Sequence, residues 1–203
     1  MSKDMLETLQ SFDESLFLLI NKSWVNGAFD VFFPFITDLL KKPWAVMGAL
    51  PLLLGFWVYK QRGYAIKGIV AALLVVSACD LFSYRVIKSI VKRPRPNHIE
   101  ALASTVRVPG RPPSPSFPSN HATNMFGLAV VLSWYIPAGF WLFYLYAALV
   151  AYSRVYVGVH FPLDVTVGAC LGVGVAFLLR KGLFERVKWF QFPRGPSVNL
   201  SPR

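Results

Sequence analysis

Residues 140–179 read FWLFYLYAALVAYSRVYVGVHFPLDVTVGACLGVGVAFLL. The stretch consists of two apolar runs, 140–159 and 161–179, and each is close to the ~20 residues with which a helix crosses the core of a bilayer. The charged and histidine residues of this stretch all lie near the junction of the runs: Arg154, His160 and Asp164. We therefore predict two membrane-crossing helices that meet at a polar turn.

Three more apolar runs precede this stretch, at about 44–59, 66–91 and 122–136. Of the 203 residues, 55% are hydrophobic and only 15% are charged, whereas a soluble domain usually carries about 25% charged residues. Mean hydropathy is +0.48. We predict an all-α integral-membrane helical bundle of about five transmembrane helices over residues 44–180, followed by a basic tail over residues 181–203.

The N-terminal segment, residues 1–43, is amphipathic, with apolar residues at helical spacing and acidic residues between them. We predict two short helices that lie at the membrane surface. The alternative is a sixth span through 16–36. That span would bury Lys22, Asn26 and Asp30 at membrane depth, where charge is costly.

The chain carries 21 basic and 10 acidic residues, a net charge of +11. Such an excess predicts an anionic partner, either lipid headgroups or a phosphate-bearing substrate. Nucleic acid is disfavoured because the basic residues stand between long apolar runs. Cys79 and Cys170 each lie inside an apolar run and are predicted to be reduced and buried. The sequence leaves the oligomeric state open.

A first polar cluster runs from Lys88 to Pro96 and contains Arg95. Pro94 and Pro96 stop the preceding helix, so Arg95 is able to fold back toward Lys88. The alternative interpretation is a basic flank whose side chains reach the lipid headgroups.

A second cluster, Pro118-Ser119-Asn120-His121, immediately precedes the apolar run at 122–136. The free N–H groups at a helix N-terminus attract anions. Simple helix capping would explain Ser119 or Asn120, but it leaves a histidine at the membrane boundary unexplained.

The third cluster, Ser153 to Asp164, places His160 four residues before Asp164. This spacing lets the carboxylate accept a hydrogen bond from one imidazole nitrogen and leaves the other nitrogen free as a base or nucleophile. The alternative is that Asp164 only complements the dipole of the following helix.

Counting five crossings places all three clusters on one face of the membrane. Three basic residues, two histidines and one carboxylate then converge beside a helix N-terminus, a set sufficient for phosphoryl transfer without metal. The sequence shows no carboxylate cluster for Mg²⁺ or Ca²⁺ and no spaced Cys/His set for Zn²⁺. We expect no metal and no cofactor.

The three clusters resemble the signature of the type 2 phosphatidic acid phosphatase (PAP2) superfamily. That signature reads Lys-x6-Arg-Pro, then Pro-Ser-Gly-His, then Ser-Arg-x5-His-x3-Asp. The order and the internal spacings match over roughly 80–179. Asn120 departs from the signature, which has glycine at this position, and we expect activity to survive this change.

The resemblance implies a role for each matching residue. His160 would be the nucleophile that forms a phosphohistidine, Asp164 would orient it, and His121 would be the general acid. The phosphoryl oxygens would be bound by Lys88, Arg95, Ser119, Asn120 and Arg154.

Several other charged residues fall outside the signature roles. Asp80 lies inside an apolar run, where an acid is either functional or hydrogen-bonded within the bundle, and we favour the structural interpretation. We interpret Arg107 and Arg111 as solvated loop charges rather than headgroup ligands. The same interpretation applies to Lys92 and Arg93.

The resemblance implies a lipid phosphate or diphosphate substrate, such as undecaprenyl diphosphate, phosphatidylglycerophosphate, phosphatidic acid or the 1-phosphate of lipid A. The resemblance also implies that the protein lies in the bacterial inner membrane, with its active site facing the periplasm or exterior. Counting charges in the sequence leaves this orientation open. Two alternatives are a lipid phosphotransferase using the same phosphohistidine and a non-catalytic membrane protein. A soluble vanadium haloperoxidase shares the motifs but lacks the apolar spans.

Overall fold

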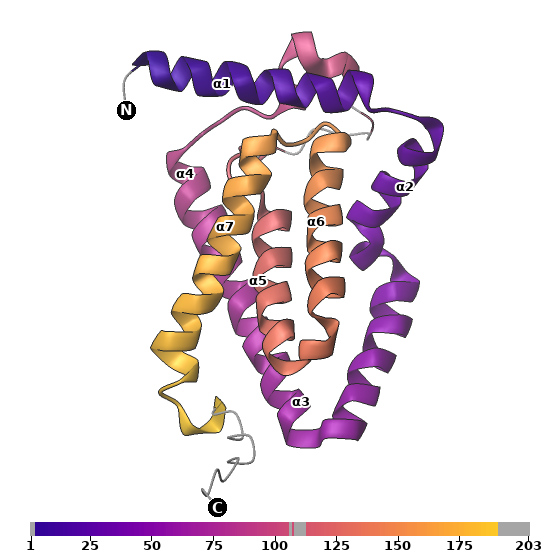
Figure 1. Cartoon of the computed structure of the whole chain (residues 1–203), viewed down its shortest axis with the longest axis vertical. Coiled ribbons are helices and arrows are strands. Elements are labelled where there is room, and N and C mark those ends of the chain that lie inside the picture. Colours follow the sequence, from indigo (N-terminus) through magenta and orange to yellow (C-terminus); the bar gives the residue numbers. More distant parts are fainter. Residues whose placement is uncertain (1–2, 106, 108–112, 191–203) are drawn as a thin grey trace, which may run out of the picture.

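The computed structural model describes residues 3–105, 107 and 113–190, and every regular element in these residues is helical (Figure 1). The principal helices run in the order α1 (Lys3–Leu18), α2 (Gly27–Asp38), α3 (Leu50–Asp80), α4 (Lys88–Ile90), α5 (Asn120–Tyr135), α6 (Phe140–Tyr156) and α7 (Pro162–Leu179). Figure 1 shows α3, α5, α6 and α7 running lengthwise through the bundle. The predicted all-α fold is confirmed.

Among the residues that the structure describes, three helical segments are long and apolar enough to cross a membrane: Ala45–Ile90, Pro137–Tyr156 and Pro162–Phe184. The first segment reverses direction at Arg62, whose backbone leaves the helical region with φ 37° and ψ −116°. Ala45–Ile90 therefore forms the two arms of a V (Figure 1). The reversal falls between the first two predicted apolar runs, at 44–59 and 66–91. The number of five crossings and the division at 44 and 181 stay predictions, and residues 191–203 of the tail lie outside the described part of the chain.

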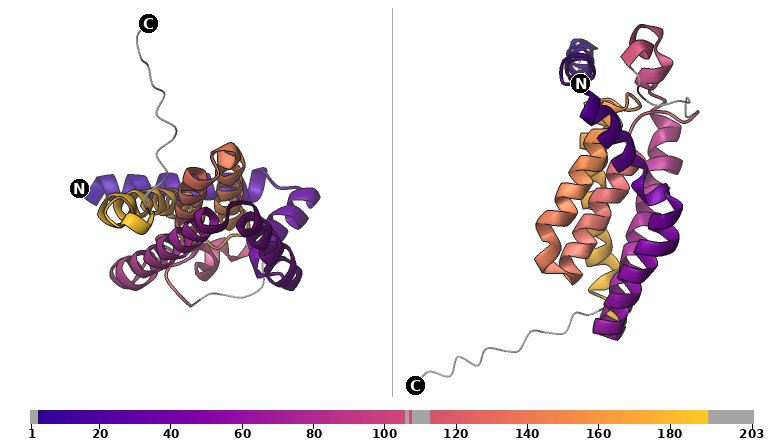
Figure 2. Two further views of the ribbon diagram at one scale, coloured as in Figure 1. Left: turned by 90° about the horizontal axis from the view of Figure 1, so that it is seen from below. Right: turned by 90° about the vertical axis from the view of Figure 1, so that its right-hand side faces the viewer.

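The two N-terminal helices take different directions. Helix α1 lies across one end of the bundle (Figures 1 and 2), the orientation expected of a surface helix. Helix α2 instead runs alongside α6. The centre of the Phe33 ring on α2 lies 4.8 Å from that of Tyr156 and 5.0 Å from that of Tyr152, both on α6. That α2 lies at the membrane surface stays a prediction.

The alternative of one continuous helix through residues 16–36 is not formed either. The chain breaks before α2, and the side chain of Asn26 caps the new helix by accepting a hydrogen bond from the Phe29 N–H at 2.9 Å. This cap satisfies one of the free N–H groups at the start of α2.

Helices α5 and α7 approach so closely that their backbones touch. A Cβ atom at Gly168 would lie 2.8 Å from the Ser119 carbonyl oxygen, and one at Gly172 would meet the Thr123 carbonyl oxygen. Such small residues, spaced four apart, are typical of close helix pairs in membranes. Because of this approach, the Ser119 N–H donates to the Asp164 carbonyl at 3.0 Å and links the second polar cluster to the third.

The two cysteines differ in exposure. Cys79 is buried, as predicted, whereas Cys170 on α7 is exposed and so contradicts the prediction. An apolar run does not reveal which face of its helix points away from the bundle.

Candidate active site

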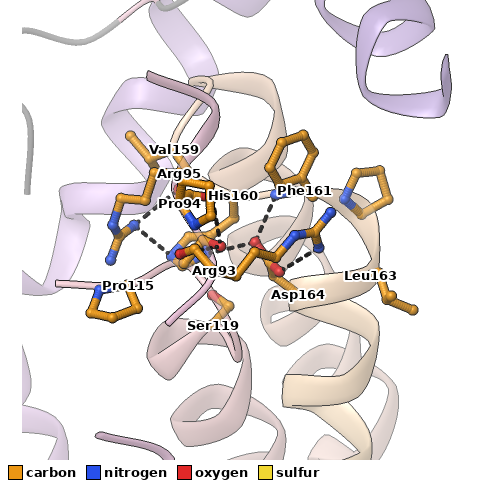
Figure 3. A network of polar contacts seen from close by, with 12 residues as sticks. Arg93, Pro94, Arg95, Pro115, Ser119, Val159, His160, Phe161, Leu163 and Asp164 are labelled. Carbon is orange, nitrogen blue, oxygen red and sulfur yellow. Dashed lines mark hydrogen bonds and ion pairs between the residues drawn. The ribbon is translucent and has the colours of Figure 1, made fainter. Parts of the chain in front are cut away.

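The three polar clusters predicted from the sequence meet at one end of the bundle (Figure 3). The first comprises α4 and the segment after it, the second begins α5, and the third joins α6 to α7. Their central side chains are almost completely buried, with exposed fractions of 5% for Arg95, 2% for His160 and 0% for Asp164.

The turn between α6 and α7 positions His160. Gly158 adopts φ 83°, a conformation that other residues rarely take. The chain then folds back, so that the N–H groups of Val159 and His160 both donate to the Arg154 carbonyl at 3.2 Å. Asp164 closes the turn when its Oδ2 accepts from the Phe161 N–H at 2.9 Å. As a result, Nδ1 of His160 faces Oδ2 of Asp164 at 3.5 Å, longer than a hydrogen bond, and no residue that the structure describes makes a hydrogen bond to this nitrogen.

The other imidazole nitrogen contacts Arg95. Nη1 of Arg95 lies 3.0 Å from Nε2 of His160 and also donates to the Val159 carbonyl at 2.9 Å. Because a guanidinium has only donors, this contact assigns a lone pair to Nε2 and the imidazole proton to Nδ1, facing Asp164. Burial, together with the positive charges of Arg95 and Arg154, lowers the pKa of His160 to about 3, although Asp164 acts in the opposite direction. His160 is therefore neutral, and the lone pair of its Nε2 points at a cation.

The remaining predicted cations lie near this centre without contacting His160. Lys88 is 3% exposed, and its Nζ donates to the carbonyl oxygens of Pro115 at 2.5 Å and Ser116 at 3.3 Å. Arg154 is 9% exposed and donates to Oγ1 of Thr37 on α2 at 2.7 Å. Within the described part of the chain, Nε of Arg154 has no hydrogen-bond partner, so it retains a free donor.

The second cluster presents free polar atoms. Ser119 is fully buried, and no described residue offers a hydrogen bond to its Oγ. His121, on the first turn of α5, lines a cavity of about 350 Å³. The structure describes no hydrogen bond that joins His121 to His160. Among the residues that the structure describes, there is no group of three or more His, Cys, Asp or Glu side chains that could hold a metal ion.

Comparison with known proteins identifies the family. The sequence model of the PAP2 superfamily matches residues 68–188, more than half of the chain. The chain belongs to the PAP2 superfamily. It is 32% identical to the lipid A 4'-phosphatase of Porphyromonas gingivalis over 95% of this chain and 83% of that protein.

Two solved PAP2-type structures share the fold. The structure of Aquifex aeolicus LpxE aligns with a TM-score of 0.59 at 31% identity, over 82% of this chain and 93% of that one. A transmembrane PAP2 type phosphatidylglycerolphosphate phosphatase from Bacillus subtilis aligns with a TM-score of 0.64 at 27% identity, over 91% and 90%. This PAP2 protein is therefore a membrane-integral phosphatase of lipid phosphates, as the resemblance implied.

Arg93 extends the PAP2 centre in a way that we did not predict. Its Nη1 donates to Oδ1 of Asp164 at 2.8 Å, and its Nη2 donates to Oδ2 of Asp13 at 2.7 Å (Figure 3 shows Arg93 and Asp164). Asp13, on α1, also accepts from the Leu163 N–H at 2.8 Å. The Arg93 guanidinium lies 4.1 Å from the centre of the Phe161 ring. Together, Asp13, Arg93 and Asp164 form a charged clamp that ties α1 to the residue behind His160.

The clamp gives Asp13 an unusual environment. Its side chain is only 4% exposed. Burial raises the pKa of the Asp13 carboxyl, while the contacts with Leu163 and Arg93 act in the opposite direction. Arg93 is therefore a structural ion-pair partner and not the solvated flank residue that we predicted.

Asp80 and Arg107 also have defined partners. Asp80 accepts hydrogen bonds from the side-chain amides of Asn120 at 3.4 Å and Asn124 at 2.9 Å, the structural role that we favoured. Arg107 contradicts the solvated interpretation, because it donates to Asp30 and to the side chain of Asn21, both at 2.8 Å. Arg111 lies outside the described residues.

Proposed function

We propose that this PAP2 enzyme hydrolyses a lipid phosphate or diphosphate through a phosphohistidine formed on His160. The observation that carries the proposal is the line of Arg95, His160 and Asp164. It holds a neutral imidazole with its lone pair toward a phosphate-binding cation and its proton toward a carboxylate. A nucleophile oriented in this way by a third group is typical of covalent catalysis.

Phosphate binding would use the cations around this line. Nη1 of Arg95 lies 3.0 Å from Nε2 of His160, in the direction from which the phosphorus atom would have to approach this nitrogen. An incoming phosphoryl group provides Arg95 with stronger, charged acceptors than an imidazole nitrogen. Lys88, Arg154 and the free hydroxyl of Ser119 would supply the other donors. We place Asn120 outside this set, because its amide is directed to Asp80.

The reaction would proceed in two displacements. Burial and the nearby cations lower the pKa of His121 to about 2, so His121 has to take up a proton when the anionic phosphate binds beside it. Nε2 of His160 then attacks phosphorus, the bond between phosphorus and the lipid oxygen breaks, and His121 donates this proton to the departing oxygen. Asp164 stabilises the positive charge that develops on the imidazole. His121 then takes a proton from water, which attacks phosphorus and releases phosphate from His160. The net reaction converts a lipid phosphate and water into a lipid alcohol and inorganic phosphate.

Substrate and location remain part of the proposal. The candidate substrates are undecaprenyl diphosphate, phosphatidylglycerophosphate, phosphatidic acid and a lipid A phosphate. The names of the Porphyromonas gingivalis and Bacillus subtilis relatives support a bacterial lipid phosphate. We place the protein in the inner membrane with the site facing the periplasm or exterior.

The test is phosphate release by the purified protein in detergent, with excess EDTA, from a panel of these lipids. His160→Ala should abolish release, whereas His98→Ala should retain it, because His98 is exposed and is the one histidine of the chain outside the proposed site. Brief reaction with labelled substrate should leave acid-labile phosphate on the wild-type protein and none on His160→Ala. Release that requires a divalent metal, or that persists without His160, would refute the mechanism.

A further inference from the structure

Helix α2 brings a side chain to the polar end of the bundle, although it lies outside residues 68–188, which the PAP2 sequence model matches. Nη1 of Arg154 donates to Oγ1 of Thr37, on the last turns of α2, at 2.7 Å. We propose that Thr37 is a positioning residue, which holds the Arg154 guanidinium in the orientation that binds the phosphoryl group. Thr37 acts through Arg154, so its role rests on the proposed function, in which Arg154 binds the phosphate.

One face of α2 is fixed against the end of α6 that carries Arg154. Asp30, Phe33 and Thr37 stand three and four residues apart, so they lie on the same face of α2. The Asp30 carboxylate accepts from the Tyr156 hydroxyl at 2.8 Å, and the centre of the Phe33 ring lies 4.8 Å from that of Tyr156. Tyr156 follows Arg154 by two residues. These contacts place Thr37 beside Arg154 independently of the hydrogen bond between them.

The Arg154 guanidinium depends on Thr37 for its orientation. Among the residues that the structure describes, Thr37 is its only hydrogen-bond partner, and no carboxylate forms an ion pair with it. Arg154 is 9% exposed and Thr37 is 6% exposed, so water has little access to replace the hydrogen bond. The next residue on α2, Asp38, pairs with Lys41 at 2.7 Å instead. Arg154 therefore keeps its full charge for an anionic ligand.

A hydroxyl is suited to this task. Oγ1 of Thr37 accepts a hydrogen bond from the guanidinium without neutralising it, whereas a carboxylate at this position would compete with the phosphate for the cation. Without the hydroxyl, the Arg154 side chain has no described partner and is free to adopt other rotamers. Because Arg154 would contact the phosphate both in the bound substrate and in the transition state, this loss should raise KM more than it lowers kcat.

The experiment compares Thr37→Val, which loses the hydroxyl, with Thr37→Ser, which keeps it. Binding of inorganic phosphate is measured from the rise in melting temperature with phosphate concentration at constant ionic strength. KM and kcat are measured on the lipid that the wild type hydrolyses fastest. Thr37→Val should raise KM and the Kd for phosphate about tenfold to a hundredfold, and Thr37→Ser should recover most of this loss. Thr8→Val is the matched control, because Thr8 is exposed and its hydroxyl donates to its own helix at Asp4.

A double variant separates positioning from a general effect on the fold. In an Arg154→Met background, Thr37→Val should cause no further change in the Kd for phosphate, because the group that Thr37 holds is absent. The melting temperature without phosphate shows whether each variant has folded. Thr37→Ala takes the place of Thr37→Val if the valine variant has not.

The outcomes distinguish the two proposals. If folded Thr37→Val binds phosphate as the wild type does, or weakens binding equally in the Arg154→Met background, Thr37 does not position Arg154, while phosphate release by the wild type keeps the proposed function. If Arg154→Met itself binds phosphate as tightly as the wild type, Arg154 is not a phosphate ligand. That result would overturn its part in the proposed function and the role of Thr37 together.

Discussion

Arg93→Gln is the most informative single change, because Arg93 joins two buried carboxylates. The Arg93 side chain is 18% exposed, whereas those of Asp13 and Asp164 are 4% and 0% exposed. Its loss removes two charge-assisted hydrogen bonds and leaves both carboxylates without their cation. Breaking a buried ion pair on one side costs about 3–5 kcal/mol of unfolding free energy. We expect a decrease in the melting temperature on the order of 10 °C.

The same change should slow catalysis without acting on the substrate directly. Arg93 holds Oδ1 of Asp164, and the other oxygen, Oδ2, faces the imidazole of His160. If the carboxylate turns, the imidazole loses its orientation, and a displacement of about 1 Å at a reacting group costs roughly a hundredfold in rate. We expect kcat to fall by about 10–100-fold while KM changes little.

The assay is steady-state phosphate release and thermal unfolding in the same detergent. Lys92→Gln is the matched control, because Lys92 is the adjacent residue, is exposed, and loses the same charge. Asp13→Asn should show a smaller loss of the same kind, since an amide oxygen still accepts from the Leu163 N–H. If Arg93→Gln matches Lys92→Gln in both kcat and melting temperature, the clamp plays no part in positioning His160.

Three further outcomes follow from the geometry. Gly172→Ala should destabilise the protein by about 1–3 kcal/mol, because a methyl group would meet the Thr123 carbonyl, whereas Gly174→Ala, with open space around it, should not. His160 has a folded pKa of about 3, below its unfolded value of about 6.5. The unfolded chain therefore binds the extra proton between these values, and the melting temperature of the wild type relative to His160→Gln should fall as the pH is lowered from 7 to 5. His121→Ala should slow release from lipid phosphates by about 10²–10⁴-fold but impair p-nitrophenyl phosphate much less, because that leaving group departs without a proton; equal losses on both substrates would exclude the acid role.

Much of the site was predictable because it depends on local spacing. His160 and Asp164 meet through a four-residue turn, and Lys88 and Arg95 lie on either side of a helix end that the prolines specify. Asp80 was also interpretable, since an acid in an apolar run needs a hydrogen-bonding partner. These inferences required only the spacing of residues and the number of crossings.

The clamp was not predictable in the same way. Asp13 and Arg93 are 80 residues apart, and their contact depends on the direction in which α1 crosses the bundle. Arg93 stands among basic residues at a helix end, where a headgroup contact is the usual explanation. Similarly, the aromatic residues of α2 gave no sign that they would pack on α6, because Pro34 and Asp38 interrupt the apolar run.

The span of the clamp has a consequence for biogenesis. Of the three residues, Asp13 on α1 is synthesised first, Arg93 follows the V-shaped segment Ala45–Ile90, and Asp164 comes last, with α7. Before Arg93 is synthesised, Asp13 lacks the cation with which it pairs in the folded protein. His160, the proposed nucleophile, comes to face Asp164 only when α7 inserts, so a partly inserted chain lacks the assembled centre.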